Sequence, residues 1–130
     1  MIQLNKDMIT EDYVSFDTAK LLKEKGFDEA TAGTYYKDGT FEYLTINRWN
    51  SKFVTPISAP TLQMACRWLT AVHNLFITFE LDFSDGAYPM FDAVVYNLAT
   101  CEKYPIINYD RYSYIKGTEA AIKYCLENLI

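Results

Sequence analysis

The side chains with the clearest potential for covalent chemistry are the single histidine, His73, and the three cysteines, Cys66, Cys101 and Cys125. A neighbouring imidazole can accept the proton of a thiol and so produce a thiolate nucleophile. Cys66 and His73 fall on one predicted helix, which places their backbones about 10 Å apart along its axis. A nucleophile and its base must approach within about 3 Å. This pair therefore cannot react directly, and a catalytic thiol would need His73 to meet Cys101 or Cys125 across the fold.

Free cysteines more often serve as small core residues than as nucleophiles. The number of cysteines is odd, and the first residues show no apolar segment of the kind that export signals contain, so we expect reduced thiols in a cytoplasm. The favoured interpretation of the thiols is therefore structural. The alternative is a small ligand-binding domain or a cysteine-dependent enzyme with a pocket near His73, Cys101 and Cys125.

The sequence also offers little to a metal ion or a phosphate group. One histidine and scattered cysteines give no zinc spacing. Glu80, Asp82, Asp85 and Asp92 supply oxygen atoms, but a hard cation needs about six or more oxygens in a compact loop, and these residues fall on predicted strands and a turn. No glycine-rich phosphate loop and no nucleophile elbow occurs. We expect no metal site and no cofactor.

A tyrosine-rich run over residues 104–114 is the most suggestive feature for binding. Tyrosine and arginine are enriched among the residues that dominate protein interfaces. The predicted partner-binding residues are Tyr104, Tyr109, Arg111, Tyr112 and Tyr114. Two other interpretations stay open: the rings can cover a sheet edge and anchor the last helix, or they can stack on single-stranded bases, which the net negative charge disfavours.

Composition sets outer limits on the fold and on the partners. A chain of 130 residues that is 50% hydrophobic can bury one sizeable core, so we expect a single domain. The formal net charge of −5 argues against binding to nucleic acid or to an anionic membrane, because both require a basic surface. No stretch approaches the ~20 apolar residues of a membrane span.

The elements that must position these side chains centre on residues 58–74. Ser58 is the predicted N-cap, and Pro60 suits the first turn because it has no amide hydrogen to leave unpaired. At about 100° per residue, apolar side chains cover most of the circumference: Leu62, Met64, Ala65, Cys66, Trp68, Leu69, Ala71 and Val72. So wide an apolar arc predicts burial on two sides, against a sheet and another helix, or against a partner.

Residues 75–83 follow directly and alternate in polarity, which predicts an antiparallel strand with one face open to water. Ile77, Phe79, Leu81 and Phe83 share the apolar face, whereas Thr78, Glu80 and Asp82 share the polar one.

Capping, turn and alternation signals predict the remaining elements. These are a helix from Ser15 to Lys25 ended by Gly26, a hairpin over residues 34–48 around Asp38-Gly39, strands over 90–98 and 104–109, and a helix over 119–129 capped by Thr118. The sequence thus predicts one α+β domain in the order α-β-β-α-β-β-(β)-α, with three helices on a mainly antiparallel sheet of four or five strands. Residues 1–14 are expected to be a loosely ordered lead-in.

Three helical segments carry a resemblance to a family: FDTAKLLKEKGFDE, PTLQMACRWLTAVHN and TEAAIKYCLENLI. They resemble small uncharacterised proteins encoded by bacteriophages and prophages of intestinal bacteria, in which a Pro-Thr-Leu helix with a Trp-Leu pair precedes a carboxy-terminal helix rich in Glu, Ala, Lys and Leu. The resemblance covers somewhat under half of the chain. It implies a bacterial host cytoplasm as the location, and it implies no activity and no site residues.

The missing catalytic set, the apolar central helix, the tyrosine-rich run and the acidic composition together predict a non-enzymatic protein–protein interaction module. It would act as an adaptor, an inhibitor or a homodimer. We expect a protein partner or self-association, and neither nucleic acid nor membrane.

Overall fold

The computed structural model describes residues 11–48, 50 and 56–130. Along the chain the elements are α1 (Phe16–Glu24), β1 (Thr31–Tyr35), β2 (Phe41–Arg48), β3 (Ile57–Ser58), α2 (Leu62–His73), β4 (Leu75–Asp82), β5 (Met90–Asn97), β6 (Lys103–Pro105) and α3 (Tyr114–Tyr124). A π-helical turn, Cys125–Leu129, continues α3. The predicted α+β class is confirmed. The strands form two three-stranded antiparallel sheets, β2-β1-β3 and β4-β5-β6, rather than the single sheet that we expected.

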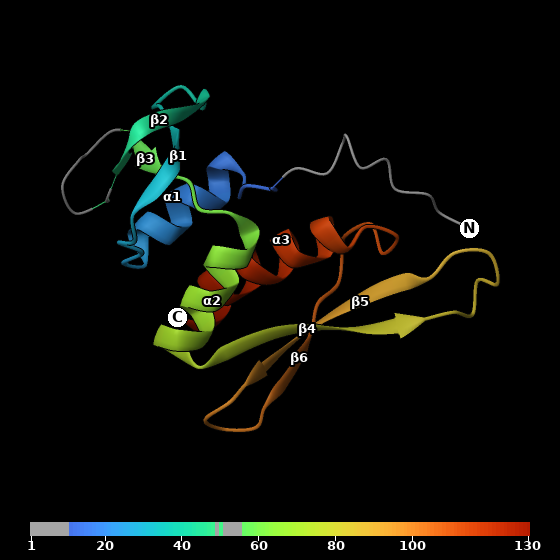
Figure 1. Cartoon of the computed structure of the whole chain (residues 1–130). Coiled ribbons are helices and arrows are strands. Elements are labelled where there is room, and N and C mark those ends of the chain that lie inside the picture. Colours follow the sequence, from blue (N-terminus) through green and yellow to red (C-terminus); the bar gives the residue numbers. More distant parts are fainter. Residues whose placement is uncertain (1–10, 49, 51–55) are drawn as a thin grey trace.

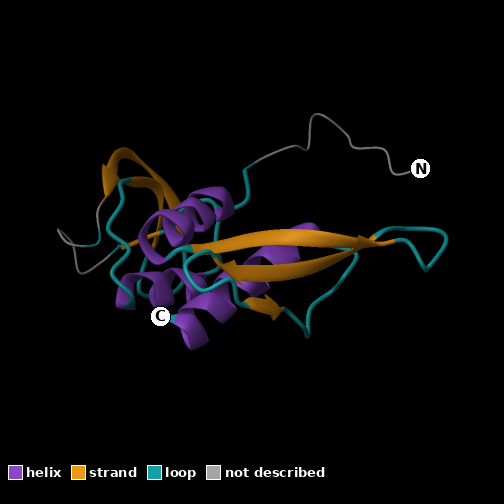
Figure 2. Cartoon of the chain, turned by 90° about the horizontal axis from the view of Figure 1, so that it is seen from below, coloured by secondary structure: helices purple, strands orange, loops and turns teal. Residues whose placement is uncertain are grey.

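The three helices lie between the two sheets, with the first sheet beside α1 and the second beside α2 and α3 (Figures 1 and 2). One cluster of buried side chains joins the three helices to the second sheet, and its largest members are Leu22, Phe27, Trp68, Leu69, Leu75, Ile122 and Leu126. The three predicted helices and strand β4 therefore share one core.

The first helix has the caps that its sequence predicts. The Ser15 hydroxyl accepts a hydrogen bond from the Thr18 amide at 3.2 Å, and Gly26 follows the helix with a φ of 92°. Glu119 of α3 reinforces this end, because its carboxylate accepts bonds from the Ser15 amide at 3.0 Å and the Thr18 hydroxyl at 2.6 Å. A negative charge beside a helix amino terminus is stabilising.

The start of α2 differs from the prediction. Thr61, not Ser58, is the N-cap, and its hydroxyl accepts a hydrogen bond from the Met64 amide at 3.1 Å. Ser58 is buried in β3, where it pairs with Thr34 of β1. Pro60 precedes the cap, and its carbonyl accepts a bond from the Val14 amide at 3.1 Å. The extended pairing of residues 57–60 delays the helix.

Part of the predicted lead-in is packed. Residues 1–10 lie outside the described residues, but Val14 is completely buried and Tyr13 forms an isolated bridge with Thr61. Residues 13 and 14 therefore join the fold rather than preceding it.

Strands β4 and β5 form a regular hairpin whose far end projects beyond the helices (Figure 1). The predicted alternation is present, and Ile77 and Phe79 pack against the core. Leu81 and Phe83 are 51% and 67% exposed because the hairpin has left the helices at this point. The predicted strand over 104–109 is shortened to β6, an edge strand that contains Pro105, which is where a proline without an amide hydrogen is tolerated.

The last helix begins earlier than predicted. Ser113 is its N-cap and accepts a hydrogen bond from the Lys116 amide at 3.2 Å, so Thr118 lies inside the helix. Gly117 is also inside and is buried; a Cβ there would lie 2.9 Å from Phe79 and 3.0 Å from Tyr109. Glycine is used here because α3 approaches the second sheet closely, not because the helix begins there.

Candidate functional site

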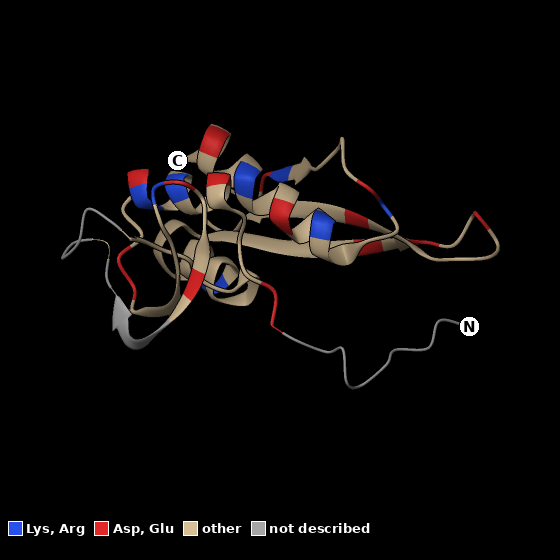
Figure 3. Cartoon of the chain, turned by 90° about the horizontal axis from the view of Figure 1, so that it is seen from above, with Lys and Arg blue, Asp and Glu red and all other residues tan. Residues whose placement is uncertain are grey.

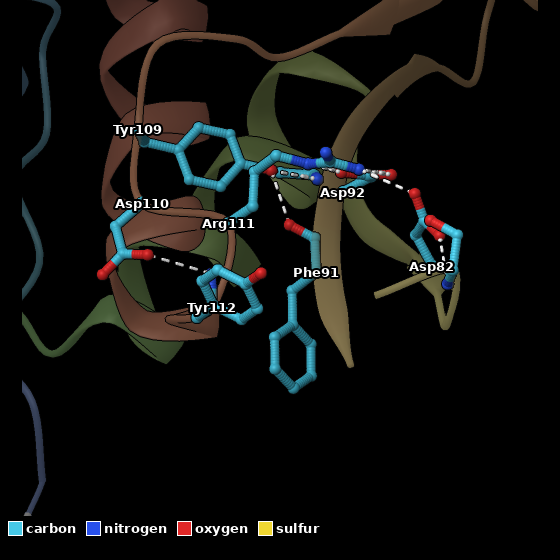
Figure 4. Close-up of polar contacts among 9 residues, drawn as sticks. Asp82, Phe91, Asp92, Tyr109, Asp110, Arg111 and Tyr112 are labelled. Atoms are coloured by element: carbon cyan, nitrogen blue, oxygen red, sulfur yellow. Dashed lines mark hydrogen bonds and ion pairs between the residues drawn. The ribbon is translucent and has the colours of Figure 1, made fainter. Parts of the chain in front are cut away.

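The predicted partner-binding run occupies the segment between β6 and α3. Tyr104 is half-buried in β6 and packs against the core. The Tyr109 hydroxyl accepts a hydrogen bond from the Ala93 amide at 2.6 Å and donates one to the Phe91 carbonyl at 2.7 Å (Figure 4). It therefore takes the place that a neighbouring strand would occupy along β5. The segment is built first of all to complete the second sheet.

Arg111 also forms hydrogen bonds along the side of β5 that Tyr109 contacts. Its carbonyl accepts a hydrogen bond from the Phe91 amide at 2.6 Å. Its guanidinium donates to both carboxylate oxygens of Asp92, at 2.6 and 2.9 Å, and to Asp82 at 3.0 Å (Figure 4). These contacts raise the pKa of Arg111 above its usual value. One side chain thus ties the segment to both β4 and β5.

Asp82 is held in its charged form from two sides. The Ser84 amide donates a hydrogen bond to the carboxylate at 2.8 Å. Hydrogen bonds with the side chain and the amide of Ser84, and then with Arg111, lower the pKa of Asp82. Nearby, Lys103 contacts Glu80 at 2.8 Å. The charges on this outer face are therefore paired with one another.

Tyr112 and Tyr114 are the members of the predicted set that remain open, at 51% and 57% exposure. The Tyr114 ring lies 5.8 Å from the Phe91 ring, measured between centroids. The run thus divides into residues that the fold itself uses and two aromatic side chains that a partner could contact. The assignment of this run to partner binding stays a prediction.

The residues that could perform thiol chemistry lie in different surroundings. Cys125 is completely buried and Cys101 is exposed. Burial raises the pKa of Cys66 to about 11, and burial together with the nearby Cys66 raises the pKa of Cys125 to about 12. The thiolate is the reactive form, so both thiols are poor nucleophiles at neutral pH.

His73 ends α2 with its ring edge-on to Trp68, at 4.8 Å between centroids. Its Nε2 atom is buried and has no hydrogen-bond partner within the described residues. Across that same part of the chain, no group of three or more His, Cys, Asp or Glu side chains could hold a metal ion. No described helix is long and apolar enough to cross a membrane.

The apolar arc of α2 is only partly covered. Leu62, Ala65, Trp68 and Leu69 face the core, whereas Met64 and Val72 are 36% and 55% exposed. An open groove of about 530 Å³ runs over this uncovered side, and it is lined by Glu29, Ala30, Thr61, Gln63, Met64, Arg67, Trp68, Ala71 and Val72. Within the part of the chain that the structure describes, one of the two sides that the sequence predicted to be buried is covered.

A second groove of about 410 Å³ lies between α2 and β4. Phe76, which is 45% exposed, lines it together with Ile77, Arg67 and Ala71. Phe76 was not predicted from the sequence, although a signal was present: it is a large aromatic residue on the otherwise polar face of an alternating strand. The two grooves share Gln63, Arg67 and Ala71 and so form a continuous surface.

Charged side chains are mixed over the helices, with Lys and Arg interspersed among Asp and Glu (Figure 3). No protein-family model, no curated protein and no solved structure matches this chain.

Proposed function

We propose that this chain is a non-enzymatic protein–protein interaction module. The observation that carries the proposal is the uncovered side of α2, where Met64 and Val72 are exposed beside a groove of about 530 Å³. Exposed apolar residues gathered around a groove are typical of surfaces that bind other proteins. Arg67 lies between the two grooves and supplies a planar donor of the kind that interface hot spots favour.

The predicted modes of action are those of an adaptor, an inhibitor or a homodimer. The resemblance to phage and prophage proteins, and with it the bacterial host cytoplasm as location, stays a prediction that rests on the sequence of the helices. Tyr112 and Tyr114 remain the members of the tyrosine-rich run best placed to add contacts, because both are exposed.

The test compares capture by matched surface variants. Tagged protein is incubated with bacterial lysate and with itself, and bound protein is quantified. Val72→Glu should abolish the association, whereas Leu98→Glu should preserve it, since Val72 and Leu98 are 55% and 54% exposed but only Val72 lines the groove. Tyr112→Ala shows whether the tyrosine-rich run takes part. A captured bacterial protein that Val72→Glu leaves bound, or no association at all with folded bait, would contradict the proposal.

The second candidate, a cysteine-dependent enzyme or ligand-binding domain, is favoured by one observation, the buried and unpartnered Nε2 of His73 among the described residues. Thiol labelling of the native protein separates the two. We expect Cys101 to react readily and Cys66 and Cys125 to react slowly, because burial raises the pKa of both. Fast labelling of Cys125 would favour the enzyme.

A further inference from the structure

Strand β4 is an edge strand, and its hydrogen-bonding directions follow from its neighbours. The Leu98 amide donates to the Asn74 carbonyl at 2.8 Å, which directs residue 74 towards β5. Backbone N–H and C=O groups alternate in direction along a strand. The backbone groups of Phe76, Thr78 and Glu80 therefore also point towards β5, whereas those of Leu75, Ile77, Phe79 and Leu81 point away from it. The Thr70 hydroxyl donates to the Leu75 carbonyl at 2.9 Å, as expected for an outward-facing group.

We call Ile77, Phe79 and Leu81 the open edge. No hydrogen bond to their outward backbone groups is found within residues 11–48, 50 and 56–130. This edge is regular over all eight residues of β4 and has no proline, lysine or bulge. Edges of this kind are templates for pairing with another chain, and proteins normally protect them. Here the chain protects the opposite side of the sheet instead.

We propose that the open edge pairs with the open edge of a second copy of this chain. The two β4 strands run antiparallel about a two-fold axis at Phe79, and the two sheets become one six-stranded sheet. In this register Phe79 lies opposite Phe79, and Ile77 lies opposite Leu81. Each outward amide and carbonyl of the open edge then has a partner, and the cross-strand pairs on the core-facing side are apolar, which stabilises a sheet.

The charges of β4 also fit a second copy. Thr78 lies opposite Glu80 of the second copy, so no two carboxylates are directly paired, although each chain carries a formal net charge of −5. Asp82 of the second copy lies opposite Phe76, which lines a groove together with Arg67. Arg67 forms no ion pair among the described residues. In the pairing, Arg67 would become a second cation near the Asp82 carboxylate of the other copy, which Arg111 of its own chain already contacts at 3.0 Å.

This inference rests on the proposed function, because it names the partner of an edge that meets the second groove at Ile77. Sedimentation velocity of the full chain over a wide concentration range should show a species of twice 15.1 kDa. Leu81→Lys should raise the dissociation constant at least about tenfold, because the change places a charge opposite Ile77 at both symmetric positions. Leu98→Lys is the matched control and should leave it unchanged.

Leu81→Pro is a second variant, because it removes an outward amide as Pro105 does on the other side of the sheet. Leu81→Ala keeps that amide and should weaken association less than Leu81→Pro does. A dimer that tolerates both Leu81→Lys and Leu81→Pro would use another surface and would overturn the inference.

The register has its own test. In a Cys101→Ser background, a Thr78→Cys chain and a Glu80→Cys chain are mixed and oxidised. The register predicts disulfides between the two kinds of chain and far fewer within either sample alone. A chain that stays monomeric at every concentration, or cross-linking that shows no preference for the mixture, would overturn the inference. Capture of a different protein that requires Val72 would survive either result, so the failure of self-pairing is distinguishable from the failure of the proposed function.

Discussion

Beyond the end of β6, the Tyr109 hydroxyl and the Arg111 carbonyl form hydrogen bonds with the backbone groups of Phe91 and Ala93 in β5. We call this side of the sheet the closed edge. On the other side, the outward backbone groups of Ile77, Phe79 and Leu81 in β4 have no such partner among the described residues. β6 itself is only three residues long and carries Lys103 and Pro105, both of which discourage pairing. The same sheet thus protects one edge with several devices, whereas the other is regular and carries no proline, lysine or bulge. This difference between the two edges is the observation on which the proposed self-pairing rests.

Gly117 lies close to residues of both edges, and we expect a larger residue at this position to lower the stability of the protein more than any other change considered below. Its Cβ position lies 2.9 Å from Phe79, on the open-edge strand, and 3.0 Å from Tyr109, on the closed edge. Gly117→Val should destabilise the protein by about 3 kcal/mol, because overpacking forces rings and backbone apart. Urea unfolding measures the change. Lys116→Val, one position away on the exposed side, is the control for helix propensity, and an equal loss in both variants would contradict the steric explanation.

Removing the hydroxyl that fills the closed edge should come next. Tyr109→Phe leaves the Ala93 amide and the Phe91 carbonyl without their partner, and a buried unpaired polar group costs about 1–3 kcal/mol. Thermal or urea unfolding gives the loss. Tyr112→Phe should change stability by less than about 0.5 kcal/mol because Tyr112 is exposed. If the two variants unfold alike, Tyr109 does not hold the edge.

Hydrogen exchange should sharpen the comparison without any substitution. In dilute solution the amides of Ile77, Phe79 and Leu81 should exchange about tenfold or more faster than those of Thr78, Glu80 and Ala93, since only the latter are directed at a partner inside the chain. At high concentration self-pairing should slow the first group selectively. Uniform exchange along β4 at every concentration would show that its two sides do not differ.

The smallest expected effect concerns the ion pairs that reinforce the closed edge. The pKa of Asp82 is lowered from its ordinary value of 3.8 by the Ser84 hydrogen bond and then by Arg111. A carboxylate with a lowered pKa stabilises the fold above the unfolded pKa and loses that contribution as the pH falls through the folded pKa. The melting temperature of the native protein should therefore exceed that of Asp82→Asn slightly at pH 7, and the difference should vanish well below pH 4. A difference that persists at low pH would have another cause.

Local signals in the sequence predicted much of the fold. Ser15 and Gly26 predicted the bounds of α1, Asp38-Gly39 predicted the first hairpin, and the alternation over residues 75–83 predicted β4, because caps, turns and pleats depend on residues close together in the chain. The same approach was wrong at the starts of α2 and α3. At α2, pairing of Ser58 with the distant Thr34 keeps the backbone extended. At α3, the cap is Ser113, and Gly117 lies inside the helix, where it approaches Phe79 closely.

For the candidate site, the sequence by itself determined which residues are available: an apolar arc on the central helix and a tyrosine-rich run. Only the tertiary structure decided how they are used. It committed Tyr109 and Arg111 to β5, it left Val72 and Phe76 uncovered, and it gave β4 an edge without cover from the described residues. The physical reason is that periodicity shows which face of an element is apolar, whereas the neighbour that covers it is set by long-range packing and by hydrogen bonds between distant segments.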